Sequence, residues 1–141
     1  MMNLDLMDVI PMYMKKICLS YAPHRNKGNL NQTQIKVLIA VGKKPGISMK
    51  ELSEMIMIDQ GALSRIIKKL SDREIIKKDI SEIDRRMSYL YVDSEGLSIL
   101  ADNMEKFEEH INDIFSNFTS EENEEFIGAL KILKKYLERI E

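Results

Sequence analysis

Residues 48–92 read SMKELSEMIMIDQGALSRIIKKLSDREIIKKDISEIDRRMSYLYV, and this stretch decides the fold. Ser48 and Asp59 are good helix N-caps, and apolar residues follow each of them at helical spacing, so two helices joined by a short turn are predicted. After Ile75 the pattern changes to two extended segments around a polar turn at residues 81–86. Two helices followed by a charged hairpin predict a winged helix-turn-helix, which can place its second helix in a DNA major groove.

The second predicted helix has two distinct faces. Its apolar stripe consists of Leu63, Ile66, Ile67 and Leu70. Its outward face is polar and basic, and it consists of Gln60, Gly61, Ser64, Arg65, Lys68 and Lys69. Helix propensity does not require this bias, whereas contacts with phosphates and base edges would. At the hairpin turn, Arg85 and Arg86 are candidates to reach a neighbouring groove or the phosphates. These patterns favour a DNA-binding protein over an enzyme.

The charge of the chain is unevenly distributed. Its 141 residues carry a net charge of −2, which by itself argues weakly against binding to a polyanion. Residues 43–92, however, carry eleven Lys or Arg against eight Asp or Glu, whereas residues 93–141 carry five against thirteen. The acid is therefore concentrated in the C-terminal third, and the local potential of the middle segment decides where DNA would dock.

The two ends of the chain are predicted to be helical. Residues 4–21 show apolar positions at three- and four-residue steps, although Pro11 should end or kink that helix. A helix at 31–41 begins at the N-cap Asn31, and further helices are expected at about 93–117 and 119–140. Their apolar faces exceed what the winged helix can cover. We therefore expect a helix bundle to form from both ends of the chain.

Other classes of protein are disfavoured by what the sequence lacks. Cys18 is the only cysteine, and neither an apolar run of about 18 residues nor a secretory signal is present, so a cytoplasmic protein without a membrane span is expected. His24 and His110 stand outside any metal-binding motif. There is no Gly-rich phosphate loop and no nucleophile elbow, so neither catalysis nor a cofactor is expected.

The chain resembles the MarR family of transcriptional regulators, which are winged-helix proteins that work as homodimers. The resemblance covers nearly the whole chain and is most specific between residues 31 and 96. It rests on Asn31 with Gln34, on Glu51-Leu52-Ser53, on Ser64-Arg65 with Leu70, on Asp84-x-Arg86 followed by Leu90, and on Gly96. Each part is common alone, but the order and spacing of the parts are typical of this family.

This resemblance implies a mainly α fold with a small β-hairpin wing. It implies that recognition-helix residues lie near bases or phosphates of double-stranded DNA, namely Gln60, Ala62, Ser64, Arg65, Lys68 and Lys69. It also implies that Arg85 or Arg86 reaches the minor groove, and that Asp84 holds Arg86 in place through an ion pair. The expected domains are an N-terminal dimerisation helix and loop (1–30), the DNA-binding domain (31–92) and C-terminal dimerisation helices (93–141).

The resemblance further implies a homodimer on a pseudo-palindromic operator, acting as a repressor that a small molecule releases. Ten methionines fit ordinary core packing, or else a pliable pocket for a small lipophilic or phenolic effector. Cys18 fits an inert side chain, or else a redox sensor, since Lys15 and Lys16 precede it. A winged-helix module that binds proteins instead of DNA is the other alternative.

Overall fold

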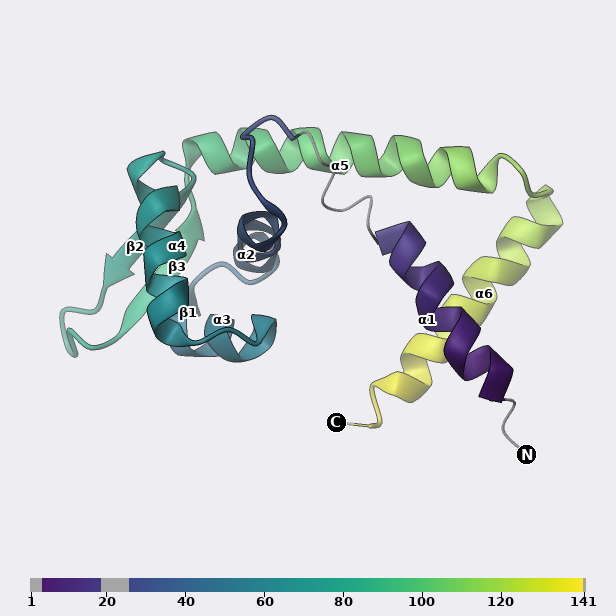
Figure 1. The fold of residues 1–141 in the computed structure, drawn as a ribbon, viewed down its shortest axis with the longest axis horizontal. Helices are drawn as coiled ribbons and strands as arrows, with labels where there is room; N and C mark the ends of the chain where they lie inside the picture. The colour runs from purple at the N-terminus through teal and green to yellow at the C-terminus, as the bar shows by residue number, and fades with distance from the viewer. Residues whose placement is uncertain (1–3, 19–25, 141) are drawn as a thin grey trace. The chain divides into compact units, whose positions relative to one another are not determined.

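The structure is a computed structural model, which describes residues 4–18 and 26–140 (Figure 1). The elements in chain order are α1 (Leu4–Cys18), α2 (Gln32–Lys43), β1 (Ile47–Ser48), α3 (Met49–Ile56), α4 (Gln60–Asp72), β2 (Ile76–Ile80), β3 (Ser88–Val92), α5 (Ser94–Phe115) and α6 (Ser120–Leu137). The prediction of a mainly α protein with a small β wing is confirmed. Two compact units divide the chain: the first ends at Lys106 and the second begins at Phe107, so the boundary falls within α5.

The hydrophobic core of the first unit lies among α2, α3, α4, the sheet and the start of α5. Its largest fully buried side chains are Ile35, Leu38, Ile47, Leu52, Leu63, Ile67, Leu70, Ile75, Ile76, Leu90 and Ile99. Each helix contributes one apolar stripe, as its spacing predicts. This core packs α4 against β2.

The sheet has three antiparallel strands in the order β1-β3-β2, where the sequence predicts only the hairpin of β2 and β3. In the hairpin, Ile76 pairs with Val92 and Ile80 with Ser88. The added strand β1 is short and follows Gly46, whose φ of +83° favours glycine. The Gly46 N–H donates to the Leu90 carbonyl at 2.8 Å and thereby starts the pairing with β3. A two-residue strand is too short to show a period of two in the sequence.

Helix boundaries follow the capping residues. The side chains of Asn31, Ser48, Asp59 and Thr119 accept hydrogen bonds from backbone N–H groups of α2, α3, α4 and α6. Asn31 forms a full capping box with Gln34, as predicted. Met57, the C-cap of α3, and Glu74, two residues after the end of α4, both have φ in the left-handed region. The turn between α3 and α4 is therefore tight and defined.

Helix α1 runs from Leu4 to Cys18 with Pro11 inside it. Of the two outcomes expected at Pro11, a helix end is therefore wrong. Residues 19–21, which the sequence assigns to the same helix, lie outside the described residues. Most of the described α1 side chains are exposed, including Leu6, Ile10 and Tyr13.

The first turn of α5 packs tightly against the loop that follows α4. Asp93 N–H donates to the Ile75 carbonyl at 2.9 Å, and Glu95 N–H donates to the Glu74 carbonyl at 3.1 Å. Gly96 permits this approach, because a Cβ there would lie 2.1 Å from the Ile75 carbonyl oxygen. The loop that follows α4 and the start of α5 are therefore held together.

The second unit contains the end of α5 and the whole of α6. Phe115, Phe118 and Phe126 form an aromatic cluster, with Phe115 and Phe126 meeting edge to face at 5.4 Å between ring centroids. None of the residues of α6 is buried, although the helix carries an apolar stripe. Several of these apolar side chains are exposed: Ile127, Ile132, Leu133, Tyr136 and Leu137.

Candidate nucleic-acid interface

Helix α4 presents its polar face to solvent. Leu63, Ile67 and Leu70 are buried in the core, and Ile66 packs partly against it. The opposite face is exposed at Gln60, Ser64, Arg65, Lys68 and Lys69, while Ala62 is half-buried. The predicted division of the helix into an apolar and a basic face is confirmed. Whether these residues contact DNA is a separate prediction.

The wing turn joins β2 to β3 and is held by its own hydrogen bonds. Ser81 N–H donates to the Met87 carbonyl, and Met87 N–H donates to the Asp84 carbonyl, both at 2.9 Å. Asp84 N–H donates to the Ser81 Oγ at 3.2 Å. A turn closed by three such bonds presents its side chains in a defined arrangement.

Asp84 and Arg86 form an ion pair within this turn. The Arg86 Nε donates to Asp84 Oδ1 at 3.1 Å, and the Arg86 backbone N–H donates to the same oxygen at 3.0 Å. These bonds to the Arg86 side chain and backbone lower the pKa of the Asp84 carboxyl below its ordinary value. The Arg86 side chain nevertheless remains 91% exposed. The ion pair therefore orients the Arg86 side chain, while its guanidinium remains accessible to a partner.

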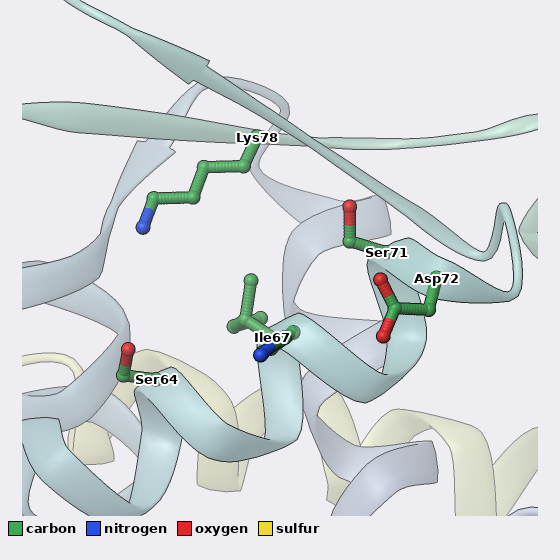
Figure 2. Close-up of a pocket in the computed structure, with 6 residues that line it drawn as sticks. Ser64, Ile67, Ser71, Asp72 and Lys78 are labelled. Carbon is green, nitrogen blue, oxygen red and sulfur yellow. The ribbon is translucent and has the colours of Figure 1, made fainter.

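A shallow pocket of about 260 Å³ separates α4 from the wing strand β2. Figure 2 shows Lys78 extending from the strand towards α4, where Ser64, Ile67, Ser71 and Asp72 lie along the helix. Lys68 also lines this pocket, so cations from the helix and the strand face the same hollow. A phosphate beside α4 would meet both cations, although the carboxylate of Asp72 lines the same pocket.

Sequence reasoning did not select Lys78 as a site residue. The signal that could have found it is the period of two in β2, which places Lys78 on the same face as the buried Ile76. Ile76 meets the core under α4, and Lys78 lies farther along the strand, where the helix face is polar. The pairing of α4 with this strand, which tertiary packing decides, was the missing information.

Two further residues singled out in the sequence, Cys18 and His24, fall wholly or partly outside the described residues. Cys18 is the last residue of α1, and its side chain lies outside the described part of the chain, as does His24. Within residues 4–18 and 26–140, no group of His, Cys, Asp or Glu is placed to hold a metal ion. No helix in these segments is both long and apolar enough to cross a membrane.

Comparisons with known proteins agree with the order of these parts. The model of the MarR family matches residues 30–88, from the cap of α2 to the start of β3. The HTH-type transcriptional regulator YybA of Bacillus subtilis (strain 168) is 30% identical over 112 residues, which cover 79% of this chain and 74% of YybA. The chain belongs to the MarR family.

A second relative has the same level of identity. The HTH-type transcriptional regulator BilQ of Clostridium symbiosum (strain WAL-14163) is 30% identical over 98 residues, covering 70% of this chain and 68% of BilQ. MarR family proteins are transcriptional regulators and not enzymes, and this MarR family chain is accordingly a transcriptional regulator.

Solved structures share the fold along nearly the whole chain. The transcriptional regulator Tm0710 from Thermotoga maritima has a TM-score of 0.80 at 18% identity, covering 97% of this chain and 96% of its own. FabT of Streptococcus pneumoniae, solved in complex with DNA, has a TM-score of 0.74 at 17% identity, covering 99% of this chain and 100% of its own. This MarR family protein therefore shares its fold with FabT, a protein whose structure was solved in complex with DNA.

Proposed function

We propose that this MarR family protein is a sequence-specific DNA-binding repressor that acts in the cytoplasm as a homodimer on a pseudo-palindromic operator. The observation that carries the proposal is the exposed basic face of α4 beside a wing that ends in Arg85 and Arg86. A local basic surface can attract DNA even though the whole chain is slightly acidic. FabT, which shares the fold, was solved in complex with DNA.

In this proposal α4 enters the major groove. Gln60, Ala62, Ser64 and Arg65 lie at the N-terminal half of the helix, where side chains reach base edges in helix-turn-helix proteins. Lys68 and Lys69 lie farther along and contact phosphates, together with Lys78 from the wing. Arg85 and Arg86 approach the minor groove, and Asp84 keeps the Arg86 guanidinium oriented.

The dimer is proposed from apolar surface that the single chain leaves uncovered. Leu6 and Ile10 in α1 and Leu133 and Leu137 in α6 are all about half exposed. Helical faces with such residues bury them against another helix or a second chain. In this proposal residues 31–92 bind DNA, and the helices in residues 1–30 and 93–141, which precede and follow them in the sequence, form the dimer. Two copies would place two α4 helices about one helical turn of DNA apart.

Effector release requires a small molecule that binds the DNA-incompatible dimer better than the DNA-bound one. The element that would transmit it is α5, whose first turn is hydrogen-bonded to the loop after α4. The segment at residues 26–30 also connects the loop after α4 with α5. Arg73 Nη2 donates to the Gly28 carbonyl at 2.5 Å, and Lys27 Nζ donates to Ser98 Oγ in α5. A shift of α5 would therefore move the recognition helix.

The proposal is tested by measuring binding to a library of duplexes at two salt concentrations. We expect one pseudo-palindrome to be selected, with an affinity that falls steeply as salt rises. Arg85→Ala and Arg86→Ala should weaken binding and reduce the salt slope by about one for each phosphate that the variant no longer neutralises. The matched control is Lys131→Ala, which removes a charge from the exposed surface of α6.

A salt slope that neither wing variant changes would contradict the wing contact. Failure to select any duplex would contradict the DNA-binding proposal as a whole, and would favour a winged-helix module that binds proteins. Hydroperoxide treatment tests the redox alternative at Cys18, because a sensing thiol would change the affinity for DNA and an inert one would not.

A further inference from the structure

The wing tip carries an apolar side chain that is fully exposed to solvent. Ile83 is 100% exposed, although the turn around it is closed by hydrogen bonds. Single exposed apolar residues are ordinary on protein surfaces. Ile83 differs because it stands at the end of the wing, two residues before the exposed Arg85 and three before Arg86.

The same end of the wing has a mixed apolar and cationic surface. Ile80 at the end of β2 is 59% exposed, and Met87, just before β3, is 41% exposed, so apolar surface flanks the turn on both sides. Ile80 and Arg85 line a shallow hollow together with Ser81 and Glu82. Asp84, which would repel DNA, is already paired with Arg86. The tip therefore offers exposed apolar side chains and two arginines, together with two acids: Asp84, which is paired with Arg86, and the exposed Glu82.

The DNA minor groove matches this combination. Its rims carry phosphates, which attract the arginines, while its walls and floor accept apolar side chains such as Ile, Leu and Met. Because the turn is already ordered, inserting Ile83 would cost little conformational entropy. The free protein, in contrast, leaves the whole side chain in water.

We propose that Ile83 is a specificity-determining residue, which enters the minor groove beside the wing arginines and selects A·T pairs there. This inference rests on the proposed function, since it assumes that the wing docks on DNA. In the minor groove, only G·C pairs present a donor, the guanine N2 amino group. An isoleucine side chain has no acceptor for that donor, so a G·C pair beneath it would keep a desolvated, unpaired amino group. A·T pairs avoid this cost.

The test compares three duplexes that differ only at the positions beneath the wing. These positions carry A·T, G·C or inosine·C, and inosine is guanine without the N2 amino group. We expect the wild-type protein to bind the A·T and inosine·C duplexes with similar affinity, and the G·C duplex about tenfold more weakly for each wing, as one unpaired buried donor per wing would cause. This pattern would attribute the loss of affinity to the guanine amino group and not to the rest of the base pair.

Two variants assign the effect to the side chain. Ile83→Ser should raise the Kd for the A·T duplex by roughly fivefold to tenfold per wing, as expected for the loss of a partly buried apolar side chain. It should also reduce the ratio between the Kd for the G·C duplex and the Kd for the A·T duplex. Its salt slope should equal that of the wild type, because no charge is removed. Ile83→Leu keeps the apolar group and should keep both affinity and preference. Neither change should alter the thermal unfolding midpoint, since the Ile83 side chain is fully exposed in the free protein.

The arginine variant provides the contrast. Arg85→Ala should lower the salt slope, whereas Ile83→Ser should not, so an apolar contact and a phosphate contact give different signatures. Ile83→Ser binding all three duplexes as the wild type does would overturn this inference and leave the proposed function intact. A wild-type protein that binds no duplex would instead remove the proposed function, and this inference with it.

Discussion

At the scale of single residues, the orientation of the Arg86 side chain in the wing depends on the carboxylate of Asp84. Asp84 accepts the Arg86 backbone N–H and the Arg86 side chain with the same oxygen. Such an exposed ion pair contributes little to overall stability, because water and salt screen it. Its effect is on orientation: it restricts a long side chain that would otherwise sample many rotamers. An acid at the tip of the wing is therefore compatible with the proposed binding to DNA.

The protonation of Asp84 provides a direct test of this pair. Because Arg86 lowers the pKa of Asp84 in the folded protein, the pair persists at neutral pH and is lost only as the pH falls through that lowered pKa. Arg86→Ala should return the pKa of Asp84 towards its ordinary value. Arg85→Ala should leave it nearly unchanged, since the pair is made by Arg86. The carboxyl carbon resonance of Asp84, followed by NMR through an acid titration, measures both.

An Asp84 pKa at its ordinary value in the wild-type protein would mean that the pair does not persist in solution. An equal rise in both arginine variants would point to the general positive potential of the wing and not to a specific pair.

At the scale of elements, the sequence predicts the helices and the hairpin well and their mutual packing poorly. Asn31, Ser48, Asp59 and Thr119 determine where helices begin through local hydrogen bonds, which a sequence displays directly. The strand β1 and the place of Lys78 depend on long-range pairing of β1 with β3 and of α4 with β2. Local patterns hold no information on such pairing.

The candidate site shows the same division. The basic face of α4 follows from helical periodicity, so its residues are predicted from the sequence, and their exposure is confirmed. Ile83 lies within a turn that the sequence describes only as polar. Its complete exposure depends on the hydrogen bonds that shape residues 81–87, which no periodicity specifies.

The junction between α4 and α5 depends on a glycine, and this can be tested by stability. Gly96→Ala would place a methyl group 2.1 Å from the Ile75 carbonyl oxygen, a backbone atom that cannot rotate away. We expect destabilisation of about 1–3 kcal/mol, as for other overpacked sites. Gly128→Ala in α6 is the matched control, because nothing lies within 4 Å of that position in the chain. Thermal unfolding measured by circular dichroism compares the two.

In the control, the substitution should stabilise the helix by up to about 1 kcal/mol, because alanine is the better helix former. An unchanged midpoint in Gly96→Ala would show that α5 is not held against Ile75 as described. A loss of stability in Gly128→Ala would show that a second chain covers that position of α6.

At the scale of the whole molecule, the proposed dimer follows from the contrast between the two compact units. The first unit buries a continuous core, whereas α6 has no buried residue and exposes Leu133 and Leu137, and Ile140 beyond its end is exposed as well. Residues 93–141, which include α6, carry the excess of acidic side chains, whereas residues 43–92, which include α4, carry more basic than acidic ones. We expect a second copy of the chain to cover this apolar stripe.

Leu133→Glu combined with Leu137→Glu should convert the protein to a monomer. Both side chains are about half exposed in the chain, and glutamate is a good helix former, so the variant should keep α6 folded. Burying two added carboxylates in an interface would be strongly unfavourable. Sedimentation velocity at micromolar concentration should show a dimer for the wild type and a monomer for the variant. Lys135→Glu, which reverses a charge outside the apolar stripe, should remain a dimer.

DNA binding then separates the role of the dimer from that of the recognition surface. The monomeric variant should lose roughly 100-fold in affinity for the full pseudo-palindrome, because two linked readers gain about that factor from effective concentration. Its affinity for a single half-site should match that of the wild type, since α4 and the wing are unchanged. A wild-type protein that is monomeric at micromolar concentration would contradict the dimer. A variant that stays dimeric would place the interface elsewhere than on this stripe of α6.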